Sequence, residues 1–332
     1  MRLLGFSTVA VVLTLYGCAG DEAERSMPPP DGPFAETLAE IGGGGAHGSL
    51  GVSWADRRLV ETAGYGDKLI VSVLQPNANT VLEGARVLRR RYGFDPLASE
   101  RYVSLGGSYA FGLRLDGVDG RGLASELVAA GGKSRTEDGL EFVEIGDYAV
   151  VPDALLAADV NGLGAFDALG RDLSVLAISD RALNALLGEG ERLLDEPVYA
   201  AAARCLGDVV AVRLIPDKHL LGTEVGIELA AIGIARHHNV LCTLGGSAER
   251  AAEVAANLES SLDPAARDPV TGEPLADSVA SVSVTRDGAY GVEAVRAQLE
   301  PAPGSGPGWL LGTIATGSLI AMIQGQSESP LP

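Results

Sequence analysis

Short apolar runs alternate with helical patterns along the chain from residue 49 onward. The apolar runs are rich in Val, Ile and aromatic residues and are bounded by Gly and Asp, which predicts strands. We expect strands at 50–54, 69–74, 109–115, 140–145, 173–178, 209–214, 225–234, 240–244, 279–284 and 290–299.

Apolar residues spaced three and four positions apart predict helices between these strands. We expect helices at 81–92, 123–128, 183–187, 198–205, 251–262 and 309–323. The last is the most apolar stretch after residue 48, but it is shorter than the roughly 20 residues that a spanning helix needs. It therefore predicts a buried C-terminal helix. Together the elements predict an α+β fold of antiparallel sheets with helices packed on one face.

Two stretches share one order of elements. Residues 109–190 and 240–323 each run strand, helix, strand, strand, helix. This order predicts two halves, 49–206 and 207–326, related as a pseudo-repeat, followed by a disordered tail at 327–332. A chance coincidence of common elements is the alternative, because few residues are identical between the halves.

The first residues have the pattern of an export signal. Arg2 precedes an apolar stretch, Leu3–Leu15, which is too short for a stable spanning helix. The stretch ends at Leu15-Tyr16-Gly17-Cys18, which resembles the lipobox of bacterial lipoproteins. The resemblance implies that residues 1–17 are a signal peptide and that Cys18 carries a diacylglyceryl group as the mature N-terminus. The alternative is a signal peptide cleaved nearby, with Cys18 as an ordinary thiol.

Residues 18–48 read as a flexible tether. They contain a run of three prolines at 28–30 and four glycines at 42–45. Such composition is typical of linkers. Phe34–Ile41 is compatible with a brief helix inside the tether.

The other two cysteines are Cys205 and Cys242. An exported protein folds in an oxidising compartment, so we expect them to form a disulfide. Two buried free thiols are the alternative.

Composition narrows the class of protein. The chain has 332 residues, a formal net charge of −19 and 46% hydrophobic residues, which excludes wholesale disorder. A sequence pI of about 4.6 argues against nucleic acid as a partner, because phosphate binding needs a basic surface.

The charge is unevenly spread. Residues 49–105 carry eight basic and six acidic groups, whereas residues 106–332 carry 15 basic and 32 acidic groups. The basic excess includes four arginines on one predicted helix: Arg86, Arg89, Arg90 and Arg91. Because they are close in sequence to the tether, one hypothesis is a patch that faces anionic lipid headgroups. A solvated helix face is the alternative.

No catalytic arrangement is recognisable. The four histidines lie in the tether or in predicted turns: His47, His219, His237 and His238. The sequence has neither GxSxG nor SxxK, and Gly245-Gly246-Ser247 lacks the lysine of a phosphate-binding loop. Two acidic groups, Asp116 with Asp119 and the residues at 263–277, lie in turns without the EF-hand pattern. We therefore expect no metal and no cofactor.

Three segments resemble exported lipoproteins of high-GC actinobacteria: 114–119, 205–210 and 268–274. The resemblance implies a location and an architecture but no activity. Our leading hypothesis is a lipid-anchored, extracytoplasmic protein of the cell membrane that binds a small molecule, a cell-wall component or a partner protein without catalysis. The alternatives are an exported hydrolase with a carboxylate-based site and a structural protein of the cell envelope.

Overall fold

A computed structural model gives the arrangement of most of the chain. It describes residues 27–43, 50–74, 81–82, 84–106, 112–137, 140–145, 162–165, 168, 172–177, 179–216, 225–306 and 308–326.

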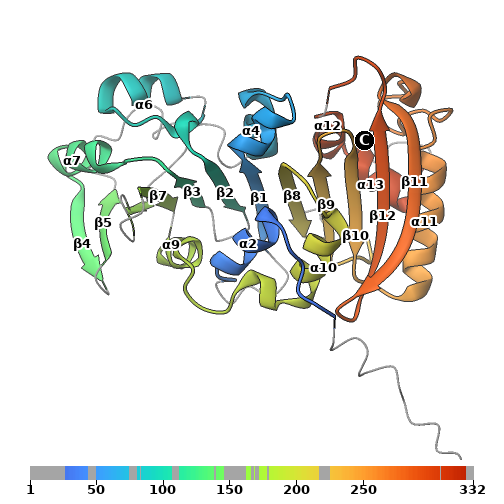
Figure 1. The fold of residues 1–332 in the computed structure, drawn as a ribbon, viewed down its shortest axis with the longest axis horizontal. Coiled ribbons are helices and arrows are strands. Elements are labelled where there is room, and N and C mark those ends of the chain that lie inside the picture. The colour runs from blue at the N-terminus through green and yellow to red at the C-terminus, as the bar shows by residue number, and fades with distance from the viewer. Residues whose placement is uncertain are drawn as a thin grey trace, which may run out of the picture.

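Among the described residues, twelve strands form one antiparallel sheet (Figure 1). The strands are β1 (Gly51–Asp56), β2 (Arg101–Gly106), β3 (Gly112–Asp116), β4 (Lys133–Glu137), β5 (Leu140–Ile145), β6 (Gly162–Ala165), β7 (Leu173–Ala177), β8 (Ala211–Pro216), β9 (Leu229–Ile234), β10 (Asn239–Leu244), β11 (Val279–Ala289) and β12 (Val292–Pro301). Their order in the sheet is β11-β12-β10-β9-β8-β1-β2-β3-β7-β6-β5-β4. The predicted α+β class is confirmed.

The described helices lie on both faces of this sheet. They are α2 (Pro33–Glu40), α3 (Arg57–Thr62), α4 (Asp67–Leu74), α6 (Ala85–Tyr92), α7 (Arg121–Ala129), α9 (Asp180–Leu187), α10 (Pro197–Leu206), α11 (Ala248–Ser261), α12 (Trp309–Thr316) and α13 (Ser318–Gln324). Short 3-10 turns are η1 (Pro96–Ala98), η3 (Leu193–Asp195) and η5 (Leu275–Asp277).

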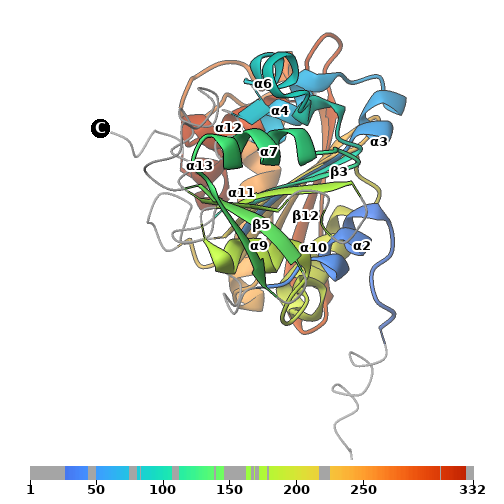
Figure 2. The ribbon, with the colours of Figure 1, turned by 90° about the vertical axis from the view of Figure 1, so that its left-hand side faces the viewer.

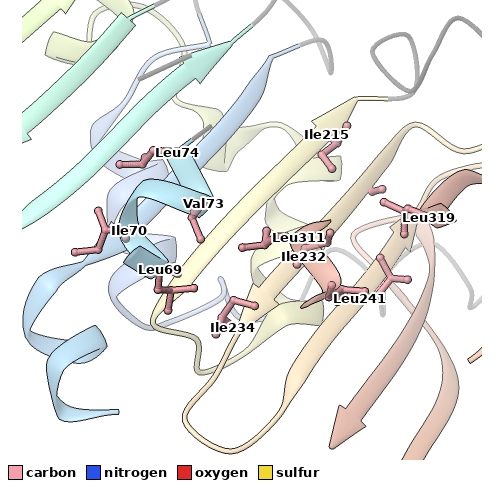
Figure 3. Close-up of a cluster of buried hydrophobic side chains, with 14 of the residues drawn as sticks. Leu69, Ile70, Val73, Leu74, Ile215, Ile232, Ile234, Leu241, Leu311 and Leu319 are labelled. Carbon is pink, nitrogen blue, oxygen red and sulfur yellow. The ribbon is translucent and has the colours of Figure 1, made fainter. Parts of the chain in front are cut away.

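Two separate hydrophobic clusters correspond to the two faces. On one face the sheet is covered by α4, α6, α7, α11, α12 and α13, and on the other by α2, α9 and α10 (Figure 2). We call these the α4 face and the α2 face. Figure 3 shows part of the α4 face, where Leu69 and Val73 of α4 lie near Ile232 and Ile234 of β9.

The prediction that helices pack on one face only was wrong. Every residue of β9 and of β10 is buried, so both faces of these central strands need a cover. The sequence carried this signal, because 225–234 is an almost continuous apolar run rather than an alternating one.

The predicted strand at 69–74 was also wrong, because these residues form helix α4. Its buried residues are Leu69, Ile70, Val73 and Leu74, which recur with the spacing of a helix face. A short apolar run fits a buried strand and a buried helix equally well, so its period does not decide between them.

Both outer parts of the sheet are built in a similar way. β3 is followed by α7 and then by the edge strand β4, just as β10 is followed by α11 and then by the edge strand β11. Within residues 49–206 the structure has three strands that the sequence did not predict: β2, β4 and β6. Strands β1 and β8 pair with each other, so both halves share one sheet.

The segment predicted as a tether is partly packed into the fold. In α2, Phe34 and Leu38 are buried, and the ring centroid of Phe34 lies 5.5 Å from that of Trp54. The backbone N–H of Gly42 donates to Ala185 O at 2.8 Å. A Cβ at Gly42 would lie 2.0 Å from Glu189 O, so this glycine serves close packing and not flexibility. The expected tether therefore does not include 33–43.

The C-terminal apolar stretch forms two helices. They are separated at Gly317, whose φ of 79° ends α12. Among the described residues, no helix is both long and apolar enough to cross a membrane.

Candidate functional site

The disulfide predicted from the sequence is present. Cys205 lies near the end of α10 and Cys242 lies in β10, with a Cα–Cα distance of 6.3 Å and an S–S distance of 2.08 Å. The bond ties α10 to the third strand from the β11 edge of the sheet, on the α2 face. Cys18, the proposed lipid attachment residue, is outside the described residues.

The four arginines of α6 are exposed. Arg89 pairs with Asp95 at 3.4 Å, and the guanidinium of Arg91 lies 5.4 Å from the ring centroid of Tyr92. Helix α6 is on the α4 face, whereas the N-terminal segment joins the fold at α2 on the opposite face (Figure 1). The closeness in sequence that suggested a lipid-facing patch is therefore not a closeness in space.

The acidic turns serve local structure. Asp119 pairs with Arg121 at 2.8 Å, and hydrogen bonds from Arg121 lower the pKa of Asp119 to about 2. Asp268 accepts hydrogen bonds from the N–H groups of Val270 and Thr271 and from the Ser318 hydroxyl. Burial alone would raise the pKa of Asp268, but these hydrogen bonds outweigh it and lower the pKa.

The described histidines do not gather with other metal ligands. His237 and His238 lie in the β9–β10 turn, where the N–H of Ala235 donates to His238 O at 2.9 Å. His47 and His219 are outside the described residues. Within the part of the chain that the structure describes, no group of three or more His, Cys, Asp or Glu could hold a metal ion.

Four charged residues form a network that the sequence did not suggest. Arg101 of β2 and Arg114 of β3 both contact Glu40 of α2 at 2.7 Å. The same two arginines contact Asp116, with Arg114 Nε 2.7 Å from Asp116 Oδ1. Arg114 also donates to Leu186 O at 3.3 Å. Two positive and two negative groups balance, so the buried guanidinium of Arg114 is neutralised and α2 is fixed to the sheet.

An apolar cavity lies beside α2. It has a volume of about 270 Å³ and lies where β1 leads into α3 and where α10 leads into β8. Phe34, Leu59, Ala63, Val209 and Val210 line it. Three charged residues also line it, and all three are exposed: Asp31, Asp208 and Arg236.

Local structure explains the position of the lining residues. Asp56 ends β1 and caps α3, because its carboxylate accepts a hydrogen bond from Leu59 N at 2.8 Å. Gly207 ends α10 with a φ of 65°, which turns the chain toward Val209 and Val210. The two turns hold the walls of the cavity apart.

A second, charged crevice of about 540 Å³ adjoins the apolar cavity. Pro33 and Leu59 line both. The crevice carries three arginines and four acidic residues: Arg57, Arg58, Arg101, Glu36, Asp56, Glu61 and Glu100. The pair of hollows therefore has one apolar and one charged part.

Arg213 of β8 is an unusual group on the α4 face. Its neighbours in the sheet are Ser53 of β1 and Ile232 of β9, and no ion pair or hydrogen bond of its side chain occurs among the described residues. Burial lowers its pKa, because the charged form is taken out of water without compensation.

Comparisons with known proteins assign no family. No family model matches the chain, and no curated protein matches it. A solved structure titled "Structure of crystal form I of TP0453" has 10% sequence identity and a TM-score of 0.39, covering 92% of this chain and 100% of that chain.

Proposed function

We propose that this protein is exported, anchored in a membrane through lipid on Cys18, and binds the alkyl chain of a small amphiphile in the cavity beside α2. It does so without catalysis. The apolar cavity bounded by Phe34, Leu59 and Val209 is the observation that carries this proposal.

The chemistry of the cavity favours an alkyl group. Its wall is mostly apolar, and the charged residues that line it are exposed. Each CH₂ group buried in such a site contributes about 0.8 kcal/mol. The adjoining crevice offers the guanidinium group of the exposed Arg58, together with carboxylates, to a polar headgroup.

The position of the cavity favours a ligand that comes from a membrane. Asp31 and Gly32 line it, and Asp31 is only 13 positions after Cys18 in the chain. A chain of that length spans at most about 45 Å when fully extended. Lipid on Cys18 would therefore keep the cavity within reach of the bilayer surface.

Calorimetric titration with sodium decanoate, below its micelle concentration, tests the binding. We expect saturable binding to the full chain with a negative heat-capacity change. Ala63→Leu places extra methyl groups at the cavity wall and should weaken binding about tenfold. Ala124→Leu, on α7 of the α4 face, is the matched control and should bind like the wild type.

Two results would contradict the binding proposal: no saturable heat with the wild-type chain, or equal affinity for Ala63→Leu and the wild type.

Membrane fractionation tests the anchor separately. Cys18→Ala should move the protein from the membrane fraction to the soluble extract, because the acyl chains would be lost. Retention of this variant in the membrane fraction would contradict the lipid anchor. It would not affect the conclusion from the decanoate titration, which tests ligand binding alone.

A further inference from the structure

The two edges of the sheet differ in how they are protected. Edge strands present unpaired backbone groups, and proteins usually shield them by short length, charge or bulges. At one edge, β4 has five residues, and three of them are charged: Lys133, Arg135 and Glu137. At the other edge, β11 has eleven residues, and its charges, Arg286 and Asp287, both lie near one end.

The hairpin turn shows which backbone groups of β11 face outward. Tyr290 and Gly291 have φ of 55° and 75°, as in a two-residue turn of type I′. In such a hairpin the two residues that flank the turn, Ala289 and Val292, exchange backbone hydrogen bonds. Every second residue of β11 before Ala289 likewise bonds to its partner in β12. The N–H and C=O groups of Val282 and Val284 therefore point away from β12.

Nothing in the described part of the chain covers these outward groups. No backbone hydrogen bond outside the β11–β12 ladder reaches residues 280–288 among the described residues. Ser281, Ser283 and Thr285 are exposed on the α2 face of the strand, and they are small and uncharged. Residues 280–285 of the edge therefore present no charged side chain to a further strand.

We propose that β11 pairs antiparallel with β11 of a second copy of this chain, about a two-fold axis at Val284. In this register Ser283 lies opposite Thr285 of the second copy, and Ser281 lies opposite Asp287 of the second copy. Arg286 lies opposite Val282 of the second copy. No two like charges are directly opposed, so the strand is complementary to itself.

Charge and symmetry favour a second copy as the occupant. The whole chain carries −19, so two copies repel each other over most of their surfaces. Residues 280–288 carry one basic and one acidic group and are neutral as a segment. Two-fold pairing uses the β11 edge of both copies, which closes the assembly at a dimer.

Sedimentation equilibrium of the purified full chain, in density-matched detergent, tests the proposal. We expect a dimer whose association strengthens with ionic strength, because salt screens the repulsion. Lysines at both Ser283 and Thr285 would oppose each other across the axis, so the double variant Ser283→Lys/Thr285→Lys should weaken dimerisation at least about tenfold.

The opposite edge supplies a matched control. Ser134→Lys/Thr136→Lys makes the same two changes, at the same spacing, on exposed positions of β4. This variant should dimerise like the wild type, and thermal unfolding should show that both variants are folded.

Three results would overturn the pairing: a monomeric wild type at every concentration, a folded β11 double variant that dimerises like the wild type, or equal weakening by the β4 variant. A complex of β11 with a different protein in place of the dimer would also overturn it.

Discussion

The two faces of the sheet are held together by different physical means. On the α2 face, a disulfide links α10 to β10, a four-charge network links α2 to β2 and β3, and the Tyr199 hydroxyl donates to Leu50 O at 2.8 Å. On the α4 face, the helices are packed mainly through apolar side chains. Polar contacts occur there too: the Ser318 hydroxyl donates to Asp268, and side chains of α11 donate to Val225 O and Ile323 O.

The longest described helix of each face, α10 and α11, differs in the side chains that it buries. Helix α2 has eight residues, and α10 has alanine at four successive positions, 200–203. Small side chains bury little apolar area, and the stabilisation scales with that area at roughly 25 cal/mol per Å². On the α4 face, α11 has 14 residues and buries Val254 and Leu258. The disulfide therefore holds a helix whose small side chains each bury little apolar area.

The largest expected effect comes from the disulfide. Replacing both cysteines, Cys205→Ser/Cys242→Ser, should lower the free energy of unfolding by about 4 kcal/mol, because the unfolded chain loses a closed loop. Urea unfolding with and without reductant measures this. Reductant should lower the stability of the wild type and leave the double variant unchanged.

A double variant as stable as the oxidised wild type would show that the disulfide does not stabilise the α2 face.

The next effect comes from the charge network. Arg114→Met removes the most buried cation and leaves Glu40 and Asp116 with one partner fewer. Breaking a buried ion pair costs about 3 kcal/mol or more, and urea unfolding should show that loss. Arg89→Met, in an exposed ion pair on the α4 face, is the control and should change stability by less than about 1 kcal/mol.

Equal losses from the two variants would show that the network adds no more than a surface pair does.

The smallest effect has the opposite sign. Arg213→Met removes a largely buried guanidinium that has no partner among the described residues. We expect a gain of about 1 kcal/mol in the free energy of unfolding, because an uncompensated charge no longer loses hydration. Thermal unfolding measures it, and Arg213→Lys, which keeps the charge, should bring no such gain.

A loss of stability in Arg213→Met would show that the α4 face also relies on a charge.

The sequence predicted those features whose cause is local. Two cysteines remain after Cys18, and this was enough to predict the disulfide between Cys205 and Cys242. The alternation of strand and helix patterns was enough to predict the α+β class. A buried C-terminal helical segment was also predicted, although Gly317 divides it. Periodicity could not decide whether residues 69–74 form a strand or a helix, because an apolar run of that length fits both.

The cavity and the charge network were beyond sequence reasoning because their parts are distant along the chain. Phe34, Leu59, Val209 and Arg236 meet only after β1 and β8 have paired. The network likewise joins Glu40 to Arg101 and Arg114 across the sheet. The glycines at 42 and 43 were misleading, since they look like a linker and serve tight packing.

The charge network also has a mechanical consequence. The segment before α2 is held to the β11–β12 turn by one hydrogen bond, from the Tyr290 hydroxyl to Pro28 O. Beyond that contact, tension applied to this segment reaches α2, and Glu40 transfers it to Arg101 and Arg114 on two neighbouring strands near the middle of the sheet. Once the Tyr290 hydrogen bond has yielded, a pull on the N-terminal end is distributed over central strands.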